Sequence, residues 1–348
     1  MKCSPLAVVV ALYGVACTPD YPEPFWTGSY LAYSTTTSAE ICEGSWRVQD
    51  KYVQALTQYL DVSVPTPLHF AYIDRSEVSD YCFQDDLDGC EYDGKAYSTR
   101  PVLFHELAHA VARGSGHEGA RAFQEGFAEV FGNGLSGSNE RVPADEVLRS
   151  FSQEGPHYYT AGLFIRFLVE RHGLEPLLSF MRRTTLDEAF ASVASTFEME
   201  FGESLDAALL AFDEYPSCGM WENRIAVVEC GLPVVPWAND RWEASSTVEC
   251  ANENVLGPMF EDDEMLVWTS QGLEIAEAGG YVVDVKGKFA GTAGVRFTRC
   301  GSCWDSVDFL VKAGQARAVT LTPGKYYATF IKTLAEVGEL DVSLTHMP

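Results

Sequence analysis

The sequence predicts an α+β protein in two parts, with a mixed, largely helical part ahead of a part built from strands. Over residues 101–215 the apolar residues recur mainly at helical spacing, which is typical of amphipathic helices. After the proline-rich segment 231–236 apolar and polar residues alternate, as they do in strands with one buried face. We therefore expect a mixed domain over 18–230, a linker over 231–240 and a β-sandwich over 241–348.

Three elements are predicted ahead of the helical region. Residues 26–37 are expected to be extended, and apolar residues over 48–60 recur at the spacing of a helix. The apolar run 68–73 is typical of a strand, and we interpret its histidine, His69, as structural. The acidic segment 85–90 lacks the full spacing of a calcium-binding loop. Calcium is therefore a weaker interpretation there than a solvated turn closed by a disulfide.

The helical region is expected to contain several separate helices. The first begins near Pro101, with Ser98 and Thr99 as candidate caps. It ends at the glycine turn 114–116. A returning helix follows, and further helices are predicted over 158–173, from 186 onward and over 197–212.

The N-terminus has the pattern of an export signal. Lys2 precedes an apolar run, and small residues lead from Gly14 to Cys17. This order resembles a bacterial lipoprotein signal, which is cleaved before the cysteine that carries the lipid. We expect residues 1–17 to direct export and Cys17 to anchor the protein at the outer membrane or cell surface. An ordinary signal, giving a secreted or periplasmic protein, is the alternative, because Gly14 stands where leucine is usual.

The cysteine count also indicates export. The chain has ten cysteines, and eight remain once Cys3 leaves with the signal and Cys17 is assigned to the lipid. An even number in an oxidising compartment predicts four disulfides. The pairing stays open, but three pairs are close in sequence and are plausible local bridges. The eight are Cys42, Cys82, Cys90, Cys218, Cys230, Cys250, Cys300 and Cys303, and the local pairs are Cys82–Cys90, Cys218–Cys230 and Cys300–Cys303.

The charge of the chain argues against one large class of function. The sequence has 24 basic and 50 acidic residues, for a net charge of −26. A nucleic-acid-binding surface needs clustered basic residues, so we expect no nucleic-acid partner. This excess of acidic residues suits a soluble protein domain exposed to solvent outside a cell. We also expect a monomer.

The segment His105-Glu106-Leu107-Ala108-His109 is an HExxH motif within an apolar run. On a helix, positions i and i+4 lie on one face. His105 and His109 can therefore hold one zinc ion together, with Glu106 beside them to act on a metal-bound water. A core helix whose histidines bond to neighbours is the alternative interpretation.

A catalytic zinc site needs a third protein ligand. After the turn at Gly114, an antiparallel helix that rises about 1.5 Å per residue returns to the height of the motif near residue 125, where Glu125 lies. Glu118 would lie too low and Glu129 one turn too far. Glu129 shares the helix face of Glu125 and is a candidate to accept the outer N–H of a ligating histidine.

The pair of motifs HELAH and EGFAE resembles those of the gluzincins, or peptidase MA-like zinc metallopeptidases. The resemblance covers roughly residues 40–215. It implies a thermolysin-like catalytic domain, built from a sheet with an edge strand and a helical bundle, and it suggests 68–73 as that strand. It further implies one zinc ion per chain held by His105, His109 and Glu125, with Glu106 as general base and acid.

A tyrosine-led segment adds to this resemblance. Residues 158–168 are similar to a helix of the aminopeptidase N branch whose first tyrosine stabilises the oxyanion. That role falls to Tyr158, with Tyr159 as the runner-up. The Gly-x-Met-Glu-Asn motif that binds a free N-terminus is absent, which favours an endopeptidase.

Other interpretations of the site are weaker or remain open. A metzincin motif would need glycine at Ala112 and histidine at Ser115, and His117 has the wrong spacing, so we interpret it as a loop residue. We expect a zinc endopeptidase that acts on peptides or proteins at a bacterial surface. A non-peptidase zinc hydrolase and a non-catalytic surface-binding lipoprotein are the alternatives.

Overall fold

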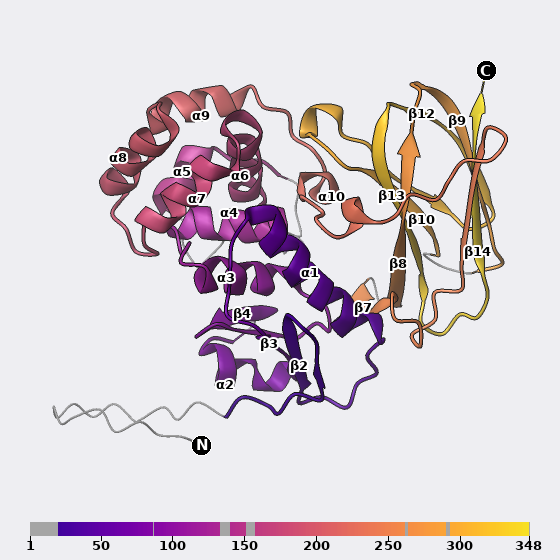
Figure 1. Cartoon of the computed structure of the whole chain (residues 1–348), viewed down its shortest axis with the longest axis horizontal. Coiled ribbons are helices and arrows are strands. Elements are labelled where there is room, and N and C mark those ends of the chain that lie inside the picture. The colour runs from indigo at the N-terminus through magenta and orange to yellow at the C-terminus, as the bar shows by residue number, and fades with distance from the viewer. Residues whose placement is uncertain are drawn as a thin grey trace.

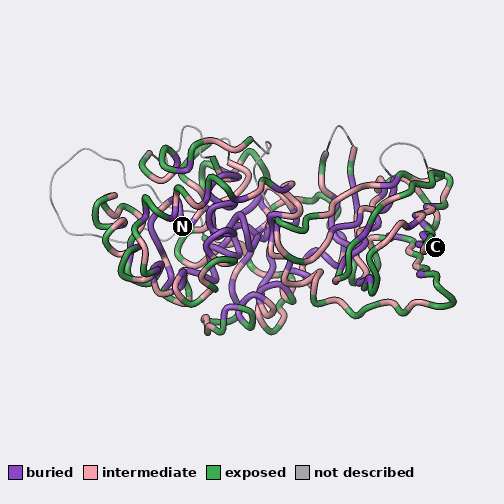
Figure 2. Tube along the Cα trace, turned by 90° about the horizontal axis from the view of Figure 1, so that it is seen from above, coloured by how far each residue is buried: buried purple, intermediate pink, exposed green. Residues whose placement is uncertain are grey.

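The computed structural model describes residues 20–85, 87–132, 140–150, 157–261, 264–289 and 293–347. The chain is an α+β fold, as the sequence predicts. In Figure 1 a small sheet and a group of helices occupy one end of the molecule, and two larger sheets occupy the other. Figure 2 shows that buried residues gather inside each end. The predicted signal segment, with Cys17, lies outside the described residues.

The first sheet has the strand order β1-β2-β3-β5-β4. Its central strands β2, β3 and β5 are parallel, and β1 and β4 pair antiparallel at the two edges. In register, Phe70 of β3 is paired with Tyr33 of β2 and with Ala96 of β5. The bounds are β1 (Trp26–Thr27), β2 (Leu31–Thr35), β3 (Leu68–Tyr72), β4 (Gly89–Tyr92) and β5 (Lys95–Ser98).

Two predictions about this sheet need correction. The strand over 68–73 forms as expected, but as β3 it is central and not the edge strand, because its apolar side chains are buried between β2 and β5. Of the two edge strands, β4 lines the cavity described below, and it begins at the end of the segment predicted as an acidic turn. In that segment Asp88 forms ion pairs with Arg75 and Arg100, and Asp86 lies outside the described residues.

Helix α1 (Gly44–Leu60) confirms the predicted helix. Its apolar face, from Val48 to Leu60, is buried in the core of the first part. Its first turn also contacts the second part. The Ser45 hydroxyl donates to the Gly257 carbonyl oxygen at 2.9 Å, and a side chain at Gly44 would meet the Val255 carbonyl. Helix α1 therefore joins the two parts.

The helices α3, α4 and α6 to α9 form a bundle beside the sheet (Figure 1) around phenylalanine-rich packing. The shorter helices α2, α5 and α10 lie in the connections between larger elements. The bounds are α2 (Val78–Cys82), α3 (Phe104–Gly114), α4 (Arg121–Phe131), α5 (Ala144–Ser150), α6 (Tyr158–His172), α7 (Leu174–Arg183), α8 (Phe190–Phe201), α9 (Leu205–Asp213) and α10 (Met220–Asn223).

The predicted start of the first helix in this region is wrong. Helix α3 begins at Phe104, and Ser98 is the last residue of β5. The Ser98 hydroxyl accepts the Arg100 N–H at 2.9 Å and so does not cap the helix. The side chain of Gln49 holds the segment between strand and helix, donating to the Pro101 carbonyl and accepting from the Leu103 N–H. The predicted end at Gly114 is confirmed.

Two later helices also differ from the prediction. Residues 186–189 are not helical, because this segment caps α4: the Leu186 carbonyl accepts the Arg121 N–H at 3.3 Å. The single helix expected over 197–212 is split into α8 and α9 at Gly202. Gly202 has a φ of 73°, which glycine adopts without the steric penalty of a side chain.

The second part consists of two antiparallel sheets, ordered β11-β10-β13-β8-β7 and β12-β9-β14-β6. Side chains from both sheets, including Trp242 and Phe330, share one buried core. The bounds are β6 (Arg241–Ser246), β7 (Leu256–Glu261), β8 (Glu264–Ile275), β9 (Gly279–Lys286), β10 (Gly294–Arg299), β11 (Asp308–Lys312), β12 (Gln315–Leu321), β13 (Gly324–Thr333) and β14 (Leu340–Met347).

The segment predicted as a linker is packed against a sheet. The Val235 N–H donates to the Gly272 carbonyl of β8 at 3.0 Å, and a side chain at Gly272 would meet the Pro233 carbonyl. The segment therefore follows β8 before β6 begins at Arg241.

All eight predicted cysteines form disulfides, but only one of the three suggested local pairs is correct. Cys82–Cys90 is formed as expected. Cys218 pairs with Cys303 and Cys230 with Cys300, so the suggested Cys218–Cys230 and Cys300–Cys303 bridges are wrong. The fourth bridge is Cys42–Cys250. Three bridges thus connect the first part to the second, and four disulfides indicate an oxidising, extracellular environment.

Among the described residues, no helix has the length and apolar character needed to cross a membrane.

The disulfide that joins α1 to the second part should contribute more stability than the local one. Cys42–Cys250 spans 208 residues and Cys82–Cys90 spans 8, and a longer closed loop restricts the unfolded chain more. We expect Cys42→Ser/Cys250→Ser to lower the free energy of unfolding by about 2–5 kcal/mol. Urea unfolding followed by tryptophan fluorescence measures this. Equal losses in Cys82→Ser/Cys90→Ser, the matched control, would contradict the prediction.

Candidate metal centre

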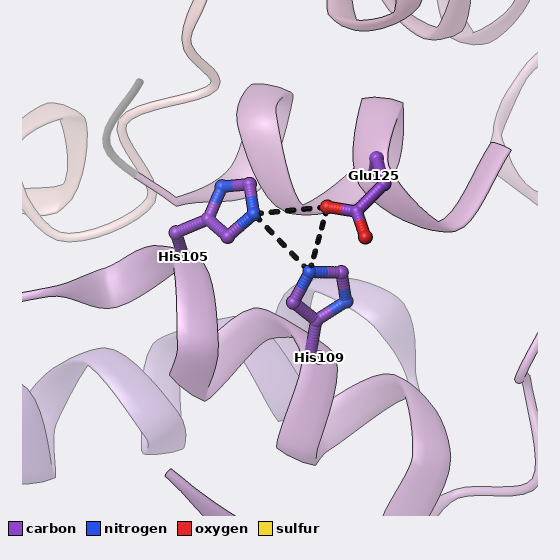
Figure 3. Close-up of side chains that lie close together, drawn as sticks. All are labelled: His105, His109 and Glu125. Carbon is purple, nitrogen blue, oxygen red and sulfur yellow. Dashed lines mark hydrogen bonds and ion pairs between the residues drawn. The ribbon is translucent and has the colours of Figure 1, made fainter. Parts of the chain in front are cut away.

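Two antiparallel helices bring three ligand atoms together. His105 and His109 lie one turn apart on α3, and their Nε2 atoms are 3.1 Å apart. Glu125 projects from α4, and its Oε2 atom lies 3.3 Å from His105 Nε2 and 3.2 Å from His109 Nε2. Figure 3 shows the three side chains pointing toward one another. The structure therefore places Glu125 beside both histidines, as the helix geometry predicts.

These distances fit a tetrahedral metal ion. Zinc bonds of about 2.0–2.1 Å in a tetrahedral site place the ligand atoms about 3.3 Å from one another. The three observed separations are 3.1–3.3 Å. Two imidazoles and one carboxylate form a donor set that suits catalytic zinc. Across the described ranges, no other His, Cys, Asp or Glu side chains form such a group of three.

The three candidate ligands line a cavity of about 530 Å³. His105 and His109 are almost inaccessible, and the side chain of Glu125 is 21% exposed. The cavity is lined by Glu106, by Tyr158 of α6 and by Gly89, Cys90 and Glu91 of β4. The metal cluster can therefore be reached from outside along the edge strand.

Two glycines allow close packing around α4, which carries Glu125. A Cβ at Gly126, the residue after Glu125, would lie 2.5 Å from the Ala161 carbonyl oxygen of α6. A Cβ at Gly132, just past the end of α4, would lie 2.6 Å from His105 Cα. Real side chains do not tolerate such contacts with backbone atoms. The glycine of the EGFAE motif is therefore required by the packing of α4 against α6.

His117 has a structural role in the turn between α3 and α4. Its Nδ1 atom is 2.9 Å from the Ser115 hydroxyl, and its Nε2 atom is 3.0 Å from Arg182. Both ring nitrogens are occupied, so His117 is a loop residue, as predicted. His69 of β3 likewise packs edge-on against Tyr21 and lies outside the metal cluster.

Glu129 lies on the predicted side of His105 but does not reach hydrogen-bond distance. Its carboxylate is 3.9 Å from His105 Nδ1. It is buried one turn beyond Glu125 on α4. The structure therefore shows a buried carboxylate facing the outer ring nitrogen as an electrostatic neighbour.

The two adjacent tyrosines of α6 point in different directions. The Tyr158 ring packs edge-on against the His105 ring, with centroids 5.7 Å apart, and it lines the cavity. The Tyr159 hydroxyl instead donates to the Cys218 carbonyl oxygen at 2.6 Å. Tyr158 is thus the tyrosine that faces the metal cluster, and Tyr159 has a structural role.

The pKa values of the groups in and around the cluster are shifted by burial and by the Glu125 carboxylate. Burial raises the pKa of Glu106. Burial alone would also raise the pKa of Glu125, but His109 and His105 together outweigh it and lower that pKa. Burial opposes the charging of His109, yet Glu125 raises the pKa of that imidazole. Burial, followed by the negative charge of Glu125, raises the pKa of Tyr158.

Sequence analysis missed one acidic residue of the cavity, Glu91. It lies on β4, its side chain is 2% exposed, and it forms an ion pair with Arg113 of α3 at 2.8 Å. Burial raises the pKa of this carboxyl, against the opposing effect of Arg113. The pair connects the edge strand to the end of the HExxH helix. No local pattern indicated it, because the two residues are brought together only by the fold.

Comparisons with known proteins do not assign the chain to a family. No family model and no curated protein matches it. The pre-peptidase C-terminal domain of collagenase from Bacillus anthracis is 11% identical over 30% of this chain and 87% of that chain, with a TM-score of 0.20. The IMPa metallopeptidase in complex with T-antigen is 14% identical over 34% of this chain and 13% of that chain, with a TM-score of 0.19.

A cycloisomaltooligosaccharide glucanotransferase from Paenibacillus sp. is similar to a comparable degree. It is 15% identical over 33% of this chain and 19% of that chain, with a TM-score of 0.18. The chain therefore spans only a small share of the last two proteins. At these TM-scores the likenesses carry no argument about fold or activity.

Replacing Gly126 should disturb the metal centre through packing alone. We expect Gly126→Ala to lower the free energy of unfolding by about 1–3 kcal/mol, because the added methyl group meets the backbone of α6. The matched control is Gly231→Ala, where no neighbouring atom lies within 4 Å. Chemical unfolding of both variants measures the difference. Equal stability of the two variants would show that the helices can separate without cost.

Proposed function

We propose that the protein is a zinc-dependent metallopeptidase of the gluzincin type, acting as an endopeptidase outside a bacterial cell. The observation that carries the proposal is the convergence of His105, His109 and Glu125, whose ligand atoms lie 3.1–3.3 Å apart. Glu106 lies next to His105 and lines the same cavity. An HExxH helix with a carboxylate from a second helix is a donor set typical of zinc hydrolases.

The architecture supports this proposal. We interpret the first part as a thermolysin-like domain, in which an edge strand and a helical bundle enclose the site. We interpret the two antiparallel sheets that follow as a β-sandwich accessory domain. The edge strand β4 lines the cavity, and its free side leaves room for an extended peptide. A long peptide can lie along such a strand, which suits cleavage within a chain.

Two side chains of the protein supply the proposed proton and charge chemistry. A bound zinc ion would supply Lewis acidity, lowering the pKa of its water toward about 7 and polarising a carbonyl group. Glu106 takes a proton from the attacking water and passes it to the leaving amine. Burial raises the pKa of Glu106 above its ordinary value, which favours acceptance of a proton. Tyr158, kept protonated by its raised pKa, donates to the developing oxyanion.

The proposed location rests on the disulfides and on the N-terminal sequence. Four disulfides indicate an oxidising environment. The pattern ending at Cys17 favours lipid attachment to that cysteine. We therefore place the catalytic domain on a lipid anchor at the bacterial surface, with peptides or proteins as substrates. The β-sandwich then binds substrate or surface, or acts as a spacer.

A metal assay paired with a protein substrate tests the proposal. We expect purified residues 18–348 to bind one zinc ion per chain and to cleave unfolded casein. Glu106→Gln should retain zinc, because Glu106 is not a ligand, and should lose at least a hundredfold in rate because it removes the proton acceptor. His109→Ala should lose zinc as well as activity.

The alternatives give different results in the same experiment. Zinc binding without cleavage of any peptide would favour a non-peptidase hydrolase. No zinc after incubation with the metal would contradict the ligand assignment and favour a surface-binding protein. Casein cleavage that is unchanged in Glu106→Gln would contradict the role of Glu106 as general base and acid.

The adjacent tyrosines provide a matched test of the oxyanion role. We expect Tyr158→Phe to lower kcat by about 10–1000-fold with KM and zinc content nearly unchanged, because it removes one transition-state donor. Tyr159→Phe should retain kcat and instead lose stability, since its hydroxyl bonds to the Cys218 carbonyl. Steady-state kinetics and thermal unfolding of both variants separate these effects. A similar loss of kcat in both variants would contradict a specific role for Tyr158.

A further inference from the structure

The candidate active-site cavity carries more positive charge than the rest of this acidic protein. The chain has only 24 basic residues in 348 and a net charge of −26. Three of those residues, Arg75, Arg113 and Arg121, line the cavity that contains the metal ligands. Four carboxylates of the protein line the same cavity, so an acidic substrate is favoured only by an arginine that they do not neutralise.

Two of the three arginines are held by carboxylates of the protein. Arg113 pairs at 2.8 Å with Glu91, whose side chain is almost fully buried. Arg75 pairs at 3.1 Å with Asp88, which also pairs with Arg100. A carboxylate of the substrate would have to displace these partners. Displacing Glu91 from Arg113 would leave a buried carboxylate without this ion pair, which is costly. Arg113 is therefore poorly suited to bind substrate. Arg75 has a side chain that is 63% exposed, but it lies outside the two helices that carry the candidate metal ligands.

Arg121 is held much more weakly. Its ion pair in the structure is with Asp187, at 3.1 Å, and the Asp187 side chain is 87% exposed. Exposed ion pairs contribute little free energy because water and salt compete with them. The side chain of Arg121 is itself 30% exposed. Its guanidinium can therefore exchange Asp187 for a carboxylate of a bound substrate at small cost.

The position of Arg121 places it close to the reaction centre. It is the first residue of α4, four residues before Glu125. Residues four apart on a helix share one face and are separated by about 6 Å along its axis. Successive residues of an extended peptide are about 3.4 Å apart. A side chain next to the cleaved bond would therefore lie within reach of the Arg121 guanidinium.

We propose that Arg121 selects substrates with an acidic side chain beside the cleaved peptide bond. This inference rests on the proposed peptidase function and adds the substrate class. A guanidinium can bind a carboxylate through two parallel N–H donors. Glutamate and aspartate offer the two acceptor oxygens that this geometry needs, glutamine offers one amide oxygen and no charge, and lysine is repelled.

The experiment begins with the cleavage sites themselves. The zinc-loaded protein, residues 18–348, is incubated with unfolded casein, and the cleaved bonds are identified by mass spectrometry. Peptides around one such bond are then synthesised with Glu, Gln or Lys at the flanking position, on either side of the bond. We expect kcat/KM for the Glu peptide to exceed that for the Gln peptide about tenfold, with the Lys peptide poorest.

Three variants and one control test Arg121 itself. Arg121→Gln should bring the Glu and Gln peptides to within about twofold of each other, while zinc content stays at one per chain. Arg121→Glu should make the Lys peptide better than the Glu peptide. Asp187→Asn should keep or increase the preference for Glu, because it removes the competing carboxylate. Arg171→Gln, which breaks an exposed pair with Glu203 elsewhere, should change nothing.

The outcomes separate this inference from the proposed function. Cleavage with no preference for Glu over Gln in the wild-type protein would overturn the role of Arg121 and leave the peptidase intact. A preference that survives in both Arg121 variants would also overturn it. No cleavage of casein by the zinc-loaded wild type would overturn the peptidase and this inference with it.

Discussion

The candidate metal centre depends on the close approach of α3 and α4, because its three ligand atoms come from these two helices alone. Two imidazoles are withdrawn from water there beside a carboxylate that is 21% exposed, and an unpaired buried charge costs several kcal/mol. The free-energy cost of burying these groups is reduced because the Glu125 carboxylate and the two imidazoles lie 3.1–3.3 Å from one another. Gly132 lets the turn beyond α4 approach the backbone of His105 in α3, and Gly126 lets α4 pack against α6. The spacing of the ligands is thus a consequence of backbone packing.

The other walls of the cavity come from elements far apart in sequence. Strand β4 supplies one wall and is connected to α3 through the Glu91–Arg113 ion pair. Its second residue, Cys90, is tied to Cys82 at the end of α2. Helix α6 supplies Tyr158, whose ring packs against the His105 ring. Three disulfides join the first part to the two large sheets. Relative motion of the two parts is therefore restricted by covalent bonds.

The ligand set could be predicted from the sequence because it follows from local geometry. The i, i+4 spacing places His105 and His109 on one face, and the length of the turn places Glu125 at the same height. The edge strand, the helix start and two disulfides were predicted incorrectly because they depend on contacts between segments far apart in the sequence. Pairing of Cys230 with Cys300 depends on how segments 70 residues apart fold together. Gln49, which holds the segment before α3, gives no local signal.

The residues proposed to bind metal or transfer protons differ in burial from the residue proposed to select substrates. Residues that would bind metal or move protons are buried and held by the fold, so their substitution affects stability as well as rate. Arg121 lies on the same helix as Glu125, yet its partner Asp187 is exposed and easily exchanged. In the proposed peptidase, a change at Arg121 would therefore alter which peptides bind without moving Glu125, four residues away.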